Sequence, residues 1–171
     1  GDVKVSVANK ENTGITGETF TVATVVEGET TASVLDSDNI VTVANDAEYT
    51  GNQIKISENY RSAVNEDSQM IKLILPKDYS WNGINTTVTT DFASNSSGNV
   101  NGTVKVDSDK ANVLEVTIDL KNAKSDIDNA LNCIYITPVF RVNRDAAEGD
   151  VTVDIENVKG DETFKQDGSK L

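Results

Sequence analysis

The chain has 171 residues, enough for one large domain or two small ones, and its hydrophobic fraction of 37% is low for a globular protein. Its net charge is −13, from 28 acidic and 15 basic residues. This charge would repel nucleic acid and anionic membrane surfaces and would attract divalent cations. We therefore expect no nucleic-acid partner, and no stretch is apolar enough to insert into a bilayer.

The residues that usually carry catalysis are scarce. The chain has one cysteine, Cys133, and no histidine. An intrachain disulfide is thus ruled out, and Cys133, in the apolar run 133–136, is expected to be a buried, inert thiol. Without histidine, the commonest general base is missing, and no pair of carboxylates stands out as a hydrolase pair. The sequence predicts that the chain is not an enzyme.

Alternating apolar and polar residues predict strands along the whole chain, beginning with Val3, Val5 and Val7 around Lys4 and Ser6. The predicted strands cover residues 3–7, 20–26, 40–43, 54–56, 70–75, 86–90, 104–106, 113–120, 134–142 and 151–155. The run 134–142 is the most apolar, which favours a central position. One short helical turn is expected at 125–131, capped by Ser125.

About ten strands, separated by clusters of Gly, Asn, Asp and Ser, are typical of an antiparallel sandwich. No long helical periodicity is present. The predicted fold class is therefore all-β, an antiparallel β-sandwich of immunoglobulin-like or related Greek-key type. No linker rich in Pro or Gly divides the chain, so residues 1–171 are expected to form a single domain.

The two ends of the chain carry copies of one β element. Residues 1–7 read Gly-Asp-Val-Lys-Val-Ser-Val, and residues 149–155, which lie 148 positions later, read Gly-Asp-Val-Thr-Val-Asp-Ile. Further on, Glu-Thr-Phe at 18–20 matches Glu-Thr-Phe at 162–164. This match indicates a tandem array, of which the chain covers one period and the start of the next.

A second interpretation of the match is that the end segments, 1–9 and 149–157, are edge strands through which subunits join head to tail. The residues expected to form these assembly strands are Val3, Val5, Val7, Val151, Val153 and Ile155.

Three pieces of sequence carry a family resemblance. They are Asn-Gln-Ile-Lys-Ile-Ser-Glu at 52–58, Ile-Lys-Leu-Ile-Leu-Pro at 71–76, and Pro-Val-Phe-Arg-Val at 138–142 followed by Ala-Glu-Gly-Asp-Val-Thr-Val at 147–153. In order and spacing they resemble the repeated β-domains of clostridial, Gram-positive cell-surface proteins of the copper amine oxidase N-terminal-like, or stalk-domain, type. The resemblance implies an extracytoplasmic, repetitive, non-catalytic module. It brings no copper site, because this chain has no histidine and one cysteine.

Three acid pairs are candidate metal ligands, since carboxylates two residues apart face the same side of an extended segment. They are Asp36 with Asp38, Asp107 with Asp109, and Asp126 with Asp128. Calcium binds several oxygen ligands and is the candidate cofactor. The alternative is turn chemistry, because Asp caps turns through its own backbone.

Other residues are candidates for modification or ligand binding. Asn85, Asn95 and Asn101 each begin an Asn-x-Ser/Thr sequon, and O-linked sugar on the Thr-rich stretch 86–90 is an alternative. Tyr79 and Trp81 flank Ser80 just after a predicted strand, where exposed rings could form a platform for a glycan. The alternative is that both rings are in the core or anchor a loop.

Together these features predict a non-catalytic structural building block of an extracellular assembly on a bacterial cell surface, namely a surface layer, stalk or filament. Its expected partners are copies of itself or neighbouring repeats, joined through the terminal strands. The alternative is an adhesion or recognition module that binds a glycan, cell-wall or protein ligand through loops such as 91–102.

Overall fold

The computed structural model describes residues 2–7, 18–24, 30–36, 42–61, 63–64, 66–123, 131–160 and 166–170, with backbone alone for 2–7, 18–24 and 166–170. Every regular element in these ranges is a strand, and all pairings between strands are antiparallel. The strands are β1 (Asp2–Val7), β2 (Glu18–Thr24), β3 (Thr30–Val34), β4 (Glu48–Thr50), β5 (Ile54–Glu58), β6 (Ser68–Ile74), β7 (Tyr79–Trp81), β8 (Thr87–Thr90), β9 (Gly102–Val106), β10 (Val113–Asp119), β11 (Cys133–Thr137), β12 (Val139–Val142), β13 (Thr152–Lys159) and β14 (Gln166–Lys170). The predicted all-β, antiparallel class is confirmed.

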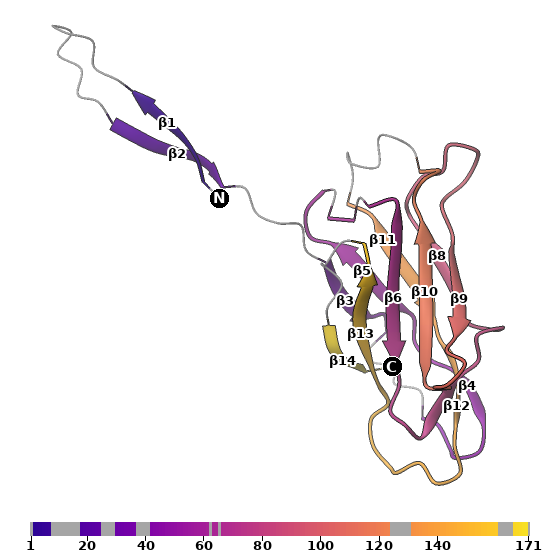
Figure 1. The fold of residues 1–171 in the computed structure, drawn as a ribbon. Helices are drawn as coiled ribbons and strands as arrows, with labels where there is room; N and C mark the ends of the chain where they lie inside the picture. Colours follow the sequence, from indigo (N-terminus) through magenta and orange to yellow (C-terminus); the bar gives the residue numbers. More distant parts are fainter. Residues whose placement is uncertain are drawn as a thin grey trace, which may run out of the picture.

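One layer is a five-stranded sheet in the order β14-β13-β6-β10-β9. The other contains the four-stranded sheet β3-β5-β11-β8, and it continues into the three-stranded sheet β4-β12-β7. Figure 1 shows β6 and β10 in front of β5, β8 and β11.

The predicted strand at 134–142 is divided in two by Pro138. Proline has no backbone N–H and cannot donate to a strand ladder. The Pro138 carbonyl instead accepts from the Gly51 amide at 2.9 Å. β11 therefore pairs with β5 and β8, whereas β12 pairs with β4 and β7.

The core lies between the two layers and follows the period of two predicted from the sequence. On β6 and β10, Leu73 and Leu114 are fully buried, and Ile54 and Ile136 are their counterparts from β5 and β11. Burial of one such side chain contributes about 1.5–3 kcal/mol to folding. The intervening residues, such as Lys72, are half-exposed.

Several local predictions differ from the structure. Of the run 40–43, residues 40 and 41 lie outside the described residues, while Thr42 and Val43 are not in a strand. Val43 instead packs against the core as a half-buried side chain. The helical turn at 125–131 also lies outside the described residues, except for Leu131, which is exposed. The sequence patterns missed β3, β4, β7 and β14, which are short or rich in polar residues.

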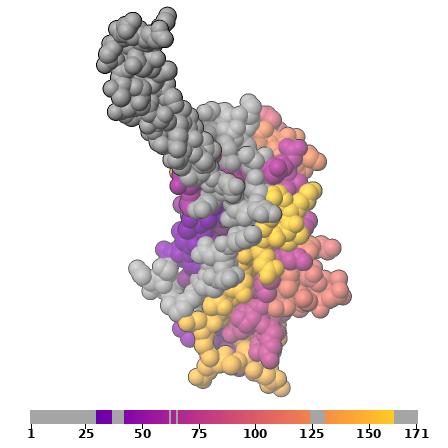
Figure 2. All heavy atoms as spheres, turned by 60° about the vertical axis from the view of Figure 1, so that its left-hand side comes forward, coloured from indigo at the N-terminus to yellow at the C-terminus, as the bar shows by residue number. Residues whose placement is uncertain are grey.

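The expectation that 149–157 is an edge strand is wrong. β13 pairs with β14 on one side and with β6 on the other, so its backbone is engaged on both edges. Val151, Val153 and Ile155 belong to the core, with Val153 fully buried. In Figure 2 the gold-to-yellow band that contains β13 crosses the face turned toward the viewer. β1 differs from β13, because it pairs with β2 in a separate sheet of two strands.

Gly102 of β9 lies directly against Val88 of β8. A Cβ atom added there would lie 2.5 Å from Cγ1 of Val88. We predict that Gly102→Ala lowers the free energy of unfolding by about 1–3 kcal/mol, because overpacking forces the strands apart. Urea denaturation measures this loss, and Thr103→Ala, on the exposed side of β9, serves as control. The Gly102→Ala/Val88→Ala pair should lose less than the sum of the single changes; additive losses would contradict the steric explanation.

Candidate functional site

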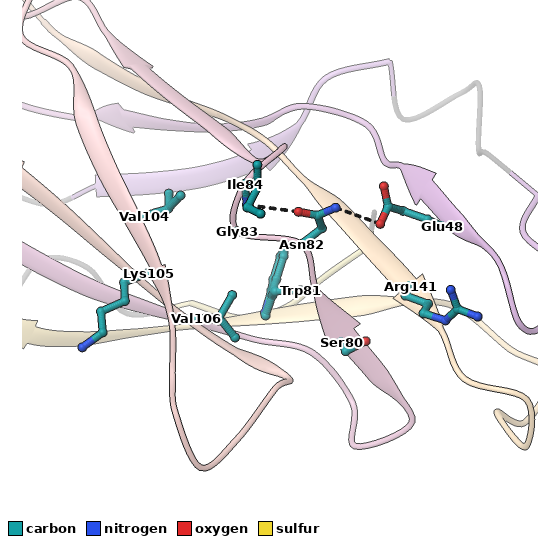
Figure 3. A pocket seen from close by; sticks show the side chains of 10 residues that line it. All are labelled: Glu48, Ser80, Trp81, Asn82, Gly83, Ile84, Val104, Lys105, Val106 and Arg141. Carbon is teal, nitrogen blue, oxygen red and sulfur yellow. Dashed lines mark hydrogen bonds between the residues drawn. The ribbon is translucent and has the colours of Figure 1, made fainter.

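An open groove of about 610 Å³ lies between the chain that follows β7 and the outer strand β9 (Figure 3). It is lined by Glu48, Ser80, Trp81, Asn82, Gly83, Ile84, Val104, Lys105, Val106 and Arg141. These residues come from both layers, because β7 belongs to one and β9 to the other. The groove therefore lies between the two layers, at the edge of the sandwich formed by β7 and β9.

The indole of Trp81 forms part of the groove wall but is almost fully buried, with 6% of its surface exposed. Its Nε1 donates to the carbonyl oxygens of Leu73 at 3.2 Å and Asn112 at 2.9 Å. Tyr79, also buried, packs edge-on against Phe140 with 6.2 Å between ring centroids. Trp81 thus ties β7 to β6 of the other layer, whereas Tyr79 packs within its own sheet, and the exposed platform expected at Tyr79 and Trp81 is not formed.

Ile84 stands at the rim of the groove with 94% of its surface exposed. The loop beneath it is held by Asn82, whose Oδ1 accepts from the amides of Ile84 at 3.0 Å and Asn85 at 3.2 Å. The Asn82 Nδ2 donates to Oε2 of Glu48 at 2.8 Å, as Figure 3 shows. A loop held by these bonds thus presents a large apolar side chain to solvent at the edge of the groove.

The opposite wall of the groove is an open sheet edge. β9 is the last strand of its sheet and pairs with β10. In an antiparallel ladder, alternate residues direct their backbone groups away from the partner strand. The Asp107 amide donates to the carbonyl oxygen of Val113 on β10, so the backbone groups of residue 107 face β10. By alternation, the backbone groups of Val106 and Val104 face away from β10, beside the groove.

The charged side chains around the groove have mixed signs. Lys105 and Arg141 are cationic, and Glu48 is anionic. The Arg141 guanidinium donates to the Asp46 carboxylate and, at 3.3 Å, to the Asp46 carbonyl. Half-exposed pairs of this kind contribute little to stability, so Arg141 is held in place without being removed from solvent.

A buried carboxylate that the sequence analysis did not single out lies at the end of β5. Glu58 is 4% exposed. Its Oε1 accepts from the Val64 amide at 2.9 Å, and its Oε2 accepts from the Asn132 amide at 2.7 Å and from Asn132 Nδ2 at 3.1 Å. The side chain therefore fastens the start of β11 and the loop after β5. The strict alternation Ile54, Ile56, Glu58 was the signal that placed it on the inner face.

Cys133 is half-buried and does not lie in the core as expected. The alternation along β11 directs Ile134 and Ile136 inward, which leaves Cys133 and Tyr135 on the outer face. The Cys133 Sγ lies 3.5 Å from Oγ of Ser57. The Tyr135 hydroxyl donates to Oδ2 of Asp91 at 3.0 Å, and desolvation together with this bond raises the pKa of Tyr135 to about 12.

The acid pairs are only partly described. Asp38, Asp126 and Asp128 lie outside the described residues, and Asp36 is exposed in a turn with φ of 56°. Asp107 caps a turn: its Oδ1 accepts from the amides of Asp109 at 2.8 Å and Lys110 at 3.1 Å, and the bond from Asp109 above all lowers the Asp107 pKa. Turn capping therefore accounts for Asp107.

Within the described ranges no three His, Cys, Asp or Glu side chains come together as a metal site would require, and calcium stays a prediction. The three sequon asparagines, Asn85, Asn95 and Asn101, are exposed. They are accessible to sugar transfer, and their modification also stays a prediction. No helix in the described part of the chain is long and apolar enough to cross a membrane.

We predict that Glu58→Ala lowers the free energy of unfolding by about 1–3 kcal/mol, because it leaves buried N–H donors without an acceptor. The matched control is Glu115→Ala, which removes a half-exposed carboxylate 3.6 Å from the Lys72 ammonium and should cost less than about 1 kcal/mol. Urea denaturation at neutral pH measures both. Equal losses in the two variants would show that Glu58 is not a structural clamp.

No protein-family model and no curated protein matches this chain. Among solved structures, it is similar to the RrgB pilus protein of Streptococcus pneumoniae, with 13% identity and a TM-score of 0.49 over 78% of this chain and 23% of that one. It is also similar to the collagen-binding domain of a Staphylococcus aureus adhesin, with 13% identity and a TM-score of 0.40 over 87% of this chain and 96% of that one. A third similarity is to the pilus 2b backbone protein of group B streptococcus, with 14% identity and a TM-score of 0.43 over 77% and 55% of the two chains. Likenesses at this level assign neither a family nor a function, and the resemblance to the clostridial stalk type stays a prediction.

Proposed function

We propose that the chain is a non-catalytic structural module, repeated in tandem, of an extracellular assembly on a bacterial cell surface such as a stalk, filament or surface layer. The observation that carries this proposal is the internal repeat. The matched segments 1–7 and 149–155 are 148 residues apart, which is close to the length of the sandwich from Thr30 to Lys170. A repeat whose period equals one folded unit is the signature of a tandem array.

The use of buried polar groups supports a mechanical role. Besides Glu58 and Trp81, the Thr86 hydroxyl donates to the Val139 carbonyl at 3.3 Å and accepts from the Val139 amide at 3.0 Å. Thr90 donates to the Val100 carbonyl and accepts from the Phe92 amide. These side chains connect segments of the sandwich to one another. Satisfied buried polar groups stabilise one arrangement of strands.

The exterior supports an exposed, hydrated location. The outer face of the second layer carries Thr31 and Ser33 on β3, Ser57 on β5, and Thr87 and Thr89 on β8. With a net charge of −13, such a surface resists non-specific association between crowded modules.

The two matched segments, 1–7 and 149–155, differ in their proposed role in the assembly. Val151, Val153 and Ile155 already fill the core of the sandwich and are not available to a neighbour. The connection between modules is therefore assigned to β1 and its alternating residues Val3, Val5 and Val7.

A chain that contains three periods of 148 residues tests the proposal. Negative-stain electron microscopy should show straight rods whose length increases by a constant step for each added repeat, because each period of 148 residues contributes one folded sandwich. Parallel samples with calcium and with a chelator report whether the acid pairs stiffen the rod. Beads that bend freely about their links under both conditions would contradict a load-bearing array.

The groove beside Ile84 favours a second candidate, the recognition of a peptide or glycan ligand. An open strand edge, an apolar rim and two cations offer backbone pairing, apolar contact and charge. Binding on peptide and glycan arrays should fall at least tenfold in Ile84→Ser and remain in Leu131→Ser, which changes another exposed apolar residue that does not line the groove. Equal binding by the two variants would eliminate the groove as the site.

A further inference from the structure

The repeated element has the same structural setting at both ends of the chain. β1 is the first strand of the antiparallel hairpin β1–β2, and β13 is the first strand of the antiparallel hairpin β13–β14. Their apolar positions correspond one to one in sequence: Val3 to Val151, which directly precedes β13, Val5 to Val153 and Val7 to Ile155.

In this sandwich the hairpin β13–β14 closes one side of the core. The pairing of β13 with β6 aligns Asp154 with Ile74 and Ile155 with Leu73. Val153 is fully buried and Ile155 is 3% exposed. Through β14 the hairpin also reaches β3, the outermost strand of the opposite layer. The hairpin thus supplies both apolar side chains and backbone hydrogen bonds to the rest of the fold.

Within the described part of its own chain, the strand that would correspond to the partner of β1 is already occupied. β1 and β2 form a sheet of two strands, so the edge of β1 away from β2 corresponds to the edge that β13 presents to β6. β6 is already paired with β13 and with β10. A two-stranded hairpin alone is marginally stable, and a strand of alternating valines requires a core to cover its apolar face.

We propose that β1–β2 is the closing hairpin of the sandwich that precedes this one in the array, and that β1 pairs there with the strand equivalent to β6. The inference rests on the proposed tandem function and names the partner that this function requires. Because β3 begins the present sandwich and β14 completes it, the repeat boundary lies after β2. The interpretation in which 149–171 opens the next repeat is thereby replaced: 149–171 ends the present one.

This assignment defines the contact surface of the neighbour. The accepting sandwich presents a β6-type strand, whose inward side chains are Ile71 and Leu73 in the present repeat. The hairpin contributes three valines in place of Val151, Val153 and Ile155. Lys4 and Ser6 replace Thr152 and Asp154, which are half-exposed and therefore tolerant of polar exchange.

A chimera tests whether the two hairpins are equivalent. In it, residues 149–171 of the full chain are replaced by a second copy of residues 1–26, and a control carries the same 26 residues in scrambled order. We expect the chimera to unfold cooperatively within about 10 °C of the native chain, with Trp81 fluorescence still typical of a buried indole, and the scrambled control to lose this transition. A chimera no more stable than the scrambled control would overturn the inference.

Matched substitutions in the native chain provide a second test. Val153→Thr should lower the melting temperature by several degrees, because it places a hydroxyl in the core. Val5→Thr, the same change at the equivalent position of β1, should leave the sandwich transition unchanged. Equal losses would show that β1 packs in its own sandwich and would overturn the inference.

The proposed function and the hairpin assignment can fail separately. A chimera that folds, combined with tandem chains that form no rods, would remove the proposed function and leave the hairpin assignment intact.

Discussion

The pairing of β6 with β10 on one side and β13 on the other is the interaction on which the rest of the sandwich depends. β6 carries Ile71 and Leu73 into the center of the core, and its two partners carry Leu114 and Val153. β10 in turn positions β9, the open wall of the groove, and β13 brings β14 toward β3. A sandwich without its closing hairpin would expose both an apolar face and an unpaired strand edge, two features that proteins rarely leave open to solvent.

The sequence predicted those parts of the fold in which the period of two is regular. β5, β6, β10 and β13 lie where alternating apolar residues placed them, because each has one buried face. It did not predict β3 or β7, whose side chains are polar or too few to show a period. Whether Trp81 and Cys133 are buried depends on which face of their strand points inward, and a single ring or thiol in the sequence does not identify that face.

The candidate sites show the same limit at longer range. Glu58 and Asn132 meet across 74 positions of sequence, and the groove forms only where strands of two sheets end side by side. No local pattern encodes such encounters, although the alternation in β5 already placed Glu58 inward. Asp107, in contrast, bonds only to near neighbours in sequence. Its side chain caps a turn by accepting from the amides of residues 109 and 110, which is the turn-capping alternative predicted from the sequence. Among the described residues, the polar chemistry of this chain chiefly holds strands together, as a structural module requires.

Amide hydrogen exchange on the intact chain tests most directly whether the closing hairpin belongs to each sandwich and the leading hairpin to its neighbour. The account predicts that the amides of β13 exchange only through global unfolding, in common with those of β6 and β10. The amides of β1 should exchange orders of magnitude faster, because their stabilising partner belongs to another repeat. Protection of β1 equal to that of β13 would contradict the account, since it would show that the leading hairpin is already part of this sandwich.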